Sequence, residues 1–215
     1  MMFKCLGCGN CCRLSPITLL PHEVHMLRRV AKRLNINIKI KPGYMVYDAI
    51  SKSLIILSYH LELDNKTRRC PFLTSDNKCL LHGRYKPCTC KSFPYVPREI
   101  HYIVDQSTKT IAHRSIYGIS TACLFVKQHG KKIEELVKLY GIQKIFPNEY
   151  KSVYEAESWR KWYMAMLTLL WRHGLINLYS DVDVEDAKRI NAYDFIVTRI
   201  MVLRNILLGN VLRRD

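Results

Sequence analysis

The pattern of apolar and polar residues changes its period along the first part of the chain. Apolar side chains recur at helical spacing over residues 24–34, and Pro21 stands in the first turn of this segment, where a missing N–H costs nothing. Residues 36–62 favour strands instead, with an alternating part at 36–40 and a short apolar run at 54–57. The first third of the chain is therefore predicted to hold one amphipathic helix followed by strands.

Strand-like patterns return at residues 99–126, and helical patterns dominate beyond them. We expect a short helix over residues 131–140 closed by Gly141, a long helix over 148–173, and a third helix from near Asp183 to near Arg213. The third helix carries an apolar stripe that is expected to pack on the aromatic face of the second, which includes Trp159, Tyr163 and Trp171. The stripe consists of Ile190, Tyr193, Ile196, Val197, Ile200, Leu203, Leu207 and Val211.

These patterns predict an α+β protein in two parts. Residues 1–128 would form a cysteine-rich domain of strands and loops, and residues 129–215 a helical segment that packs on it. A chain of 215 residues can bury a substantial core, so it does not need a metal merely because it is small. The longest apolar run, residues 163–171, is too short to span a bilayer, so no membrane span is expected.

Cysteines carry the chemistry in this sequence. Four of them lie within eight residues in the segment CLGCGNCC: Cys5, Cys8, Cys11 and Cys12. Gly7 and Gly9 stand where the chain must turn tightly to point these sulfurs at one centre, and two cysteines three apart on a loop can both reach one ion or two corners of a cluster. Because neighbouring side chains tend to diverge, we expect Cys11 and Cys12 not to bind the same metal atom.

A second cysteine block, CPFLTSDNKCLLHGRYKPCTCKSFP, runs from residue 70 to residue 94. The turn-forming SDN sequence separates Cys70 from Cys79, so their sulfurs are expected on adjoining ends of a hairpin or knuckle. In an extended chain Cys88 and Cys90 would point to opposite sides, so only one of them is expected to bind metal. Histidines are weaker ligand candidates than these thiols: His22, His25 and His82.

The total of nine cysteines is odd, and no apolar leader precedes Cys5. We therefore expect a reducing, cytoplasmic compartment, where clustered cysteines indicate metal rather than disulfides.

The net charge is +16, and its distribution along the chain is uneven. Residues 1–98 hold 17 Lys and Arg against 5 Asp and Glu, whereas residues 99–215 hold 17 Lys and Arg against 13 Asp and Glu. This basic excess indicates nucleic acid or another polyanion as a partner, unless it is simply a solvated basic surface. The face of the first helix that would touch phosphates carries Arg28, Arg29, Lys32 and Arg33.

The two cysteine blocks resemble the CxxCxxCC family, also known as the YkgJ family, whose members are described as zinc- or iron-chelating. The resemblance covers roughly residues 1–125 and rests on CLGCGNCCR at 5–13, CPFL at 70–73, Cys79, and KPCTCKSFP at 86–94, where the family usually reads RPxxCRxFP. The ligands that it implies are Cys5, Cys8, Cys11, Cys12, Cys70, Cys79 and Cys90, with Cys123 as a further candidate, while Cys88 falls on a variable position.

Seven or eight thiols exceed the four that one zinc ion or one cubane cluster takes, so two centres and one cluster with reserve cysteines both stay open. The ferredoxin-like run and the family favour an iron–sulfur cluster of the [4Fe–4S] type over zinc. Its negative charge would be stabilised by Lys4, Arg13, Lys86 and Lys91.

We therefore predict a metalloprotein that is used for electron transfer or for a cluster-dependent modification reaction. It would act with a protein redox or modification partner. Such a protein could be an enzyme, either an iron–sulfur oxidoreductase or a cluster-dependent modifying enzyme. One alternative is a structural zinc module with a basic surface that binds RNA or DNA. Another is a relative of the flagellin lysine-N-methylases, which carry a similar cysteine motif.

Overall fold

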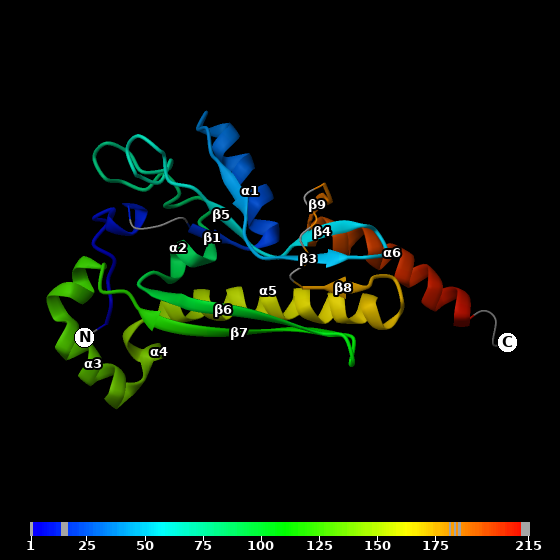
Figure 1. The fold of residues 1–215 in the computed structure, drawn as a ribbon. Helices are drawn as coiled ribbons and strands as arrows, with labels where there is room; N and C mark the ends of the chain where they lie inside the picture. Colours follow the sequence, from blue (N-terminus) through cyan, green and yellow to red (C-terminus); the bar gives the residue numbers. More distant parts are fainter. Residues whose placement is uncertain (1, 14–16, 181, 183, 185, 212–215) are drawn as a thin grey trace. The chain divides into compact units, whose positions relative to one another are not determined.

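The computed structural model describes residues 2–13, 17–180, 182, 184 and 186–211, and it confirms the α+β class (Figure 1). The chain divides into two compact units, each built from three separate segments. The first unit consists of Met1–Lys41, Tyr59–Ile100 and Ser115–Ser158. The second consists of Pro42–Ser58, His101–Arg114 and Trp159–Asp215.

The first unit begins with the cysteine loop and the helix predicted after it. The loop ends in a short 3₁₀ helix, η1 (Asn10–Arg13), and strand β1 (Ile17–Leu19) leads into helix α1 (Pro21–Arg33). Strand β1 pairs antiparallel with β5 (Tyr59–Leu61), and β2 (Ile40–Pro42) completes a sheet of order β1-β5-β2. Of the alternating segment at residues 36–40, only Ile40 lies in a strand. Helix α1 begins at Pro21 as predicted and buries one apolar face, while its four predicted basic residues are exposed.

A second group of helices in this unit anchors the N-terminus. Helix α3 (Leu124–Tyr140) starts before the predicted position, is interrupted at His129 and ends at Gly141, and α4 (Ile142–Ile145) follows it. The backbone N–H of Phe3 donates to the carbonyl of Ile145 at 2.8 Å, and its ring packs on two other phenylalanines, Phe125 and Phe146. These contacts fix the chain just before its first cysteine.

The second unit is a small mixed sheet covered by helices. Its strand order is β8-β3-β4-β9, and all four residues of β4 are buried, as the apolar run at 54–57 predicts. The strands are β3 (Met45–Asp48), β4 (Ser53–Ile56), β8 (Leu178–Tyr179) and β9 (Lys188–Asn191). Helix α5 (Pro147–Arg172), of which Trp159 onward belongs to this unit, supplies Tyr163 and Trp171 to the core.

The last helix, α6 (Ala192–Val211), starts later than predicted because Lys188–Asn191 forms strand β9 and pairs in parallel with the buried strand β4. The predicted helix-start residues Asp183 and Glu185 and the end near Arg213 lie outside the described residues, as do the side chains of Leu207 and Val211. Elsewhere the stripe packs on the aromatic face of α5 as predicted. Val197 is an exception, because it is 43% exposed. Phe195, which was not predicted as part of the stripe, is buried instead.

The remaining strands form a long hairpin. Strands β6 (Tyr95–Asp105) and β7 (Thr110–Ile119) pair with each other in a two-stranded sheet, in the region where strands are predicted, and the short helix α2 (Cys88–Ser92) precedes them (Figure 1). In the part of the chain that the structure describes, no helix combines the length and apolar composition that crossing a bilayer requires.

Truncation after residue 128 tests the predicted division of the chain. The fragment would lose Tyr163, Trp171 and Phe195, and would therefore expose buried apolar residues of the second unit such as Ile55 and Leu57. We expect the 1–128 fragment to aggregate, measured by size-exclusion chromatography beside the full chain. A soluble monomeric fragment that retains metal would show instead that the helical segment is a separate domain.

Candidate metal centre

The two cysteine blocks are joined directly through their backbones. The N–H of Cys70 donates to the carbonyl oxygen of Cys12 at 2.7 Å. Gly9 has φ +72°, and a Cβ there would lie 3.2 Å from the carbonyl oxygen of Asn77. The guanidinium of Arg13 donates to the side-chain oxygen of Asn77. The cysteine loop is therefore packed against the turn between Cys70 and Cys79, and a glycine is needed at the closest approach.

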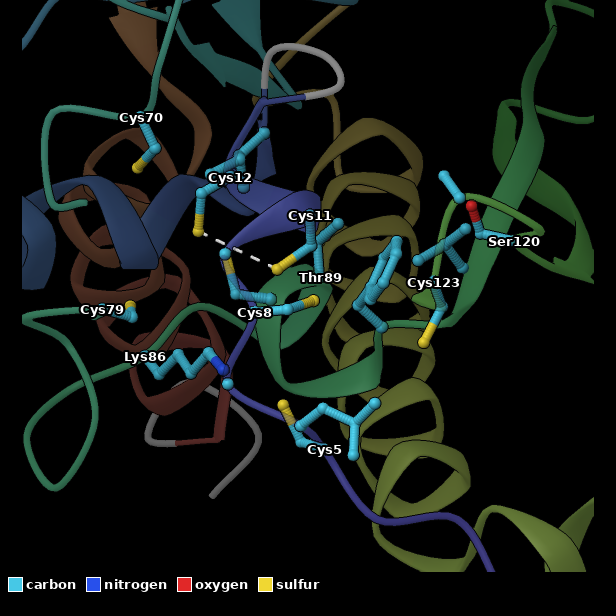
Figure 2. Close-up of a pocket in the computed structure, with 18 of the residues that line it drawn as sticks. Cys5, Cys8, Cys11, Cys12, Cys70, Cys79, Lys86, Thr89, Ser120 and Cys123 are labelled. Carbon is cyan, nitrogen blue, oxygen red and sulfur yellow. Dashed lines mark hydrogen bonds between the residues drawn. The ribbon is translucent and has the colours of Figure 1, made fainter. Parts of the chain in front are cut away.

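The Cys70–Cys79 segment forms the predicted knuckle. Leu73 and Cys79 make an antiparallel bridge around the turn. The thiol of Cys12 hydrogen-bonds with those of Cys11, Cys70 and Cys79. The sulfurs of Cys11 and Cys12 lie 3.8 Å apart (Figure 2), so the expectation that these neighbours diverge is wrong. The reason is the 3₁₀ turn at η1, in which successive side chains are about 120° apart rather than on opposite sides.

Eight of the nine cysteines line one cavity of about 590 Å³ in the first unit. Figure 2 labels Cys5, Cys8, Cys11, Cys12, Cys70, Cys79 and Cys123 around it. The full set is Cys5, Cys8, Cys11, Cys12, Cys70, Cys79, Cys90 and Cys123. No Asp or Glu is among the described residues that line the cavity, whereas three basic side chains are: Lys78, Lys86 and Arg98. Of the cations predicted to stabilise a metal centre, only Lys86 lines it; Lys4, Arg13 and Lys91 do not, and Lys91 pairs with Glu155 at 2.6 Å.

The CxC pair lies on the short helix α2, so the expectation of an extended chain is wrong. The two side chains nevertheless point to different sides, because residues two apart on a helix are about 200° apart. Cys90 lines the cavity and Cys88 does not. Instead, the buried Cys88 lies beside Glu23, whose carboxylate accepts the Cys88 N–H at 2.7 Å.

Hydrogen bonds among the thiols lower the pKa of three of these cysteines and raise the pKa of a fourth. The hydrogen bond from Cys12 lowers the pKa of Cys11 to about 7 and that of Cys79 to about 5, and Lys86 lowers both further. It also lowers the pKa of Cys70, while the same three bonds raise the pKa of Cys12. Cys11, Cys70 and Cys79 therefore lose a proton more readily than Cys12, and a thiol must be deprotonated to bind metal.

The other cavity cysteines lie in two different surroundings. Cys123 stands at the N-cap of α3, where burial raises its pKa and the charges of Cys8 and Cys5 raise it further. Burial likewise raises the pKa of Cys90, and the charges of Cys70, Cys11 and Cys79 add to this effect. Cys123 thus interacts electrostatically with Cys5 and Cys8, whereas Cys90 interacts with Cys11, Cys70 and Cys79.

Histidine contributes little to the cavity. His82 lines it, while His22 and His25 are on α1 and do not. Burial lowers the pKa of His22 to about 4.

The donor chemistry fits a soft, thiolate-binding metal, because thiolates select zinc, copper(I) and iron–sulfur clusters. Within the described residues, however, no three His, Cys, Asp or Glu side chains are arranged to hold a single ion. The sulfurs therefore surround a space instead of closing on one point.

Comparison with known proteins agrees with this donor set. The model of the CxxCxxCC family, described as a "putative zinc- or iron-chelating domain", matches residues 4–124, more than half of the chain and all nine cysteines. The chain belongs to the CxxCxxCC family. No curated protein and no solved structure matches it. The description of the CxxCxxCC family supports metal binding and names zinc or iron without choosing between them.

Three residues near the site are absent from the sequence predictions. Lys78 and Arg98 line the cavity, but the sequence around them carries no signal that would single out these two among 34 basic residues. Glu23 was detectable, because it stands at the third position of a predicted helix, where an acidic side chain often caps the helix start.

Replacement of Gly9 by Ala tests the contact between the two cysteine blocks. The added Cβ is unfavourable at the positive φ of this residue, and it also crowds the backbone of Asn77. We therefore expect a loss of about 2–4 kcal/mol in stability and a lower metal content. Gly7→Ala is the matched control, since Gly7 has φ +64° but nothing within 4 Å of the added Cβ. We expect it to cost only about 1–2 kcal/mol, measured by denaturant unfolding with metal analysis of both variants. Equal losses in the two variants would contradict the close approach.

Proposed function

We propose that this protein binds an iron–sulfur cluster of the [4Fe–4S] type in the cysteine-lined cavity. The observation that carries the proposal is that eight thiols line about 590 Å³, while no three of the described His, Cys, Asp or Glu side chains are placed to hold one ion. A zinc ion needs no such space, because four sulfurs enclose it at about 2.3 Å. A cluster of several atoms needs both the space and the separation between ligands.

The cluster would supply one-electron chemistry, used for electron transfer to a protein partner or for a modification reaction. The protein's own part is to hold and shield the site. Phe3, Phe93 and Phe125 line the cavity and exclude water from it, while Lys86 and Arg98 offset the negative charge of the thiolates. Cys5 is exposed and marks the side of the cavity that a partner can approach.

A zinc site is the alternative occupant, and one distance favours it. The 3.8 Å between the sulfurs of Cys11 and Cys12 equals the edge of a zinc–thiolate tetrahedron, which is about 3.8 Å for bonds of about 2.3 Å. In that case the vicinal pair would bind the same ion, and the site would be structural.

Serine substitutions test the ligand assignment. Cys5→Ser and Cys8→Ser are expected to lose most of the iron and sulfide and to destabilise the first unit, because each removes a thiol from the cavity. Cys88→Ser is the matched control, since Cys88 lies outside the cavity lining, and its metal content should stay close to that of the wild type. Iron, zinc and sulfide per chain are measured after purification without oxygen. Equal losses in all three variants would overturn the assignment.

A second function, binding of single-stranded nucleic acid, is favoured by a groove on the first unit. A cavity of about 380 Å³ lies along α1 and is lined by Met26, Arg29, Val30, Arg33, Leu34, Arg84 and Tyr85. It combines three guanidinium groups with one aromatic ring, and no carboxylate lies among its described lining residues. Arginine with an aromatic platform suits a phosphate backbone and its stacked bases.

Charge reversal on the two sides of α1 tests this groove. Arg29→Glu with Arg33→Glu should weaken binding of a single-stranded oligonucleotide and lower the slope of log K against log salt by about 1.4, at about 0.7 per lost phosphate contact. Arg28→Glu with Lys32→Glu changes the same net charge on the same helix outside the groove. Equal weakening by the two pairs, measured by fluorescence anisotropy, would show only a general charge effect, and no binding by the wild type would exclude the function.

A further inference from the structure

Glu23 is a buried carboxylate that joins two helices. Its side chain belongs to a residue that is only 1% exposed, yet both of its oxygens are used. One oxygen accepts the backbone N–H of Leu20 at 2.8 Å, which caps the start of α1. The other accepts the backbone N–H of Cys88 at 2.7 Å, at the start of α2. One side chain thus satisfies a free N–H at two helix starts, although Cys88 is 65 positions away from Glu23 in the sequence.

Helix α2 depends on such contacts for its place. It has five residues, far fewer than an isolated helix needs to be stable. Its other end is held by the ion pair of Lys91 with Glu155, at 2.6 Å, but these side chains are 35% and 48% exposed. Water and salt weaken an exposed pair of this kind, so the buried carboxylate is the stronger of the two attachments.

The position of α2 decides where Cys90 points. Cys90 comes two residues after the N–H that Glu23 holds, and it is the cysteine of this helix that lines the cavity. A rotation of this five-residue helix about its axis would turn Cys90 away from the cavity. Burial raises the pKa of the Tyr85 hydroxyl, and the charge of Glu23 raises it further.

We propose that Glu23 is a positioning residue of the metal centre, which holds α2 through the Cys88 N–H so that Cys90 faces the cavity. This inference rests on the proposed function, in which Cys90 is a ligand. A carboxylate is required because both of its oxygens accept a hydrogen bond. A glutamine of the same size has only one acceptor oxygen. Its NH2 group would therefore face one of the two backbone N–H groups, and two donors cannot form a hydrogen bond with each other.

The test is the rate at which the metal-loaded protein releases metal to an excess of chelator, at a temperature where circular dichroism shows all variants folded. Glu23→Gln should release metal about 10- to 100-fold faster than the wild type, the usual effect of losing support behind a ligand. Glu155→Gln, which removes the exposed ion pair with Lys91 at the other end of α2, should change the rate less than about twofold. If Glu23→Gln does not fold, Glu23→Asp, which keeps two acceptor oxygens on a shorter side chain, replaces it throughout.

A double substitution separates positioning from general stabilisation. In a Cys90→Ser background the Glu23 substitution should add no further acceleration, because the ligand that it positions is already gone. Full additivity of the two effects, or no effect of the Glu23 substitution in the wild-type background, would overturn the inference. If Cys90→Ser alone leaves metal release unchanged, it is the assignment of Cys90 in the proposed function that fails.

Discussion

The hydrogen bond from the Cys70 N–H to the Cys12 carbonyl is the constraint on which the cysteine site depends. It joins two blocks far apart in the chain, and the close packing at Gly9 and the Arg13–Asn77 contact act at the same junction. Because the bond joins two backbone groups, it brings the two blocks together and leaves the cysteine thiols available as ligands. The thiol of Cys12 can then meet those of Cys70 and Cys79, and the remaining cysteines complete the cavity.

Charge is the second constraint on this site. Ligand thiols must lose their protons, and several thiolates in one cavity would repel each other without compensation. The described cavity lining holds three cations and no carboxylate, and Lys86 lowers the pKa of two of the thiols. Glu23 does not line the cavity. Its carboxylate instead accepts hydrogen bonds from the backbone N–H groups of Leu20 and Cys88. Part of the basic excess of residues 1–98 therefore lies at the cysteines, while Arg29, Arg33 and Arg84 line the separate groove along α1.

Features that depend on a few adjacent residues were predictable from the sequence, and features that depend on distant contacts were not. Glycine spacing and turn residues predicted the cysteine loop and the knuckle. Apolar periodicity predicted α1, capping residues predicted α5, and a short apolar run predicted the buried strand β4. The start of α6 was missed because β9 is a strand only by pairing with β4. The approach of the Cys11 and Cys12 sulfurs and the helical form of α2 were missed because a 3₁₀ turn and a carboxylate from another helix impose them.

The proposed occupant of the cavity is a multi-atom iron–sulfur cluster. The most direct measurement is the content of iron, zinc and sulfide, with the visible absorption spectrum, of the full chain purified without oxygen. We expect brown protein with equal iron and sulfide, about four of each per chain. Colourless protein with stoichiometric zinc and no sulfide would contradict this proposal, and would assign the cavity cysteines to a structural site.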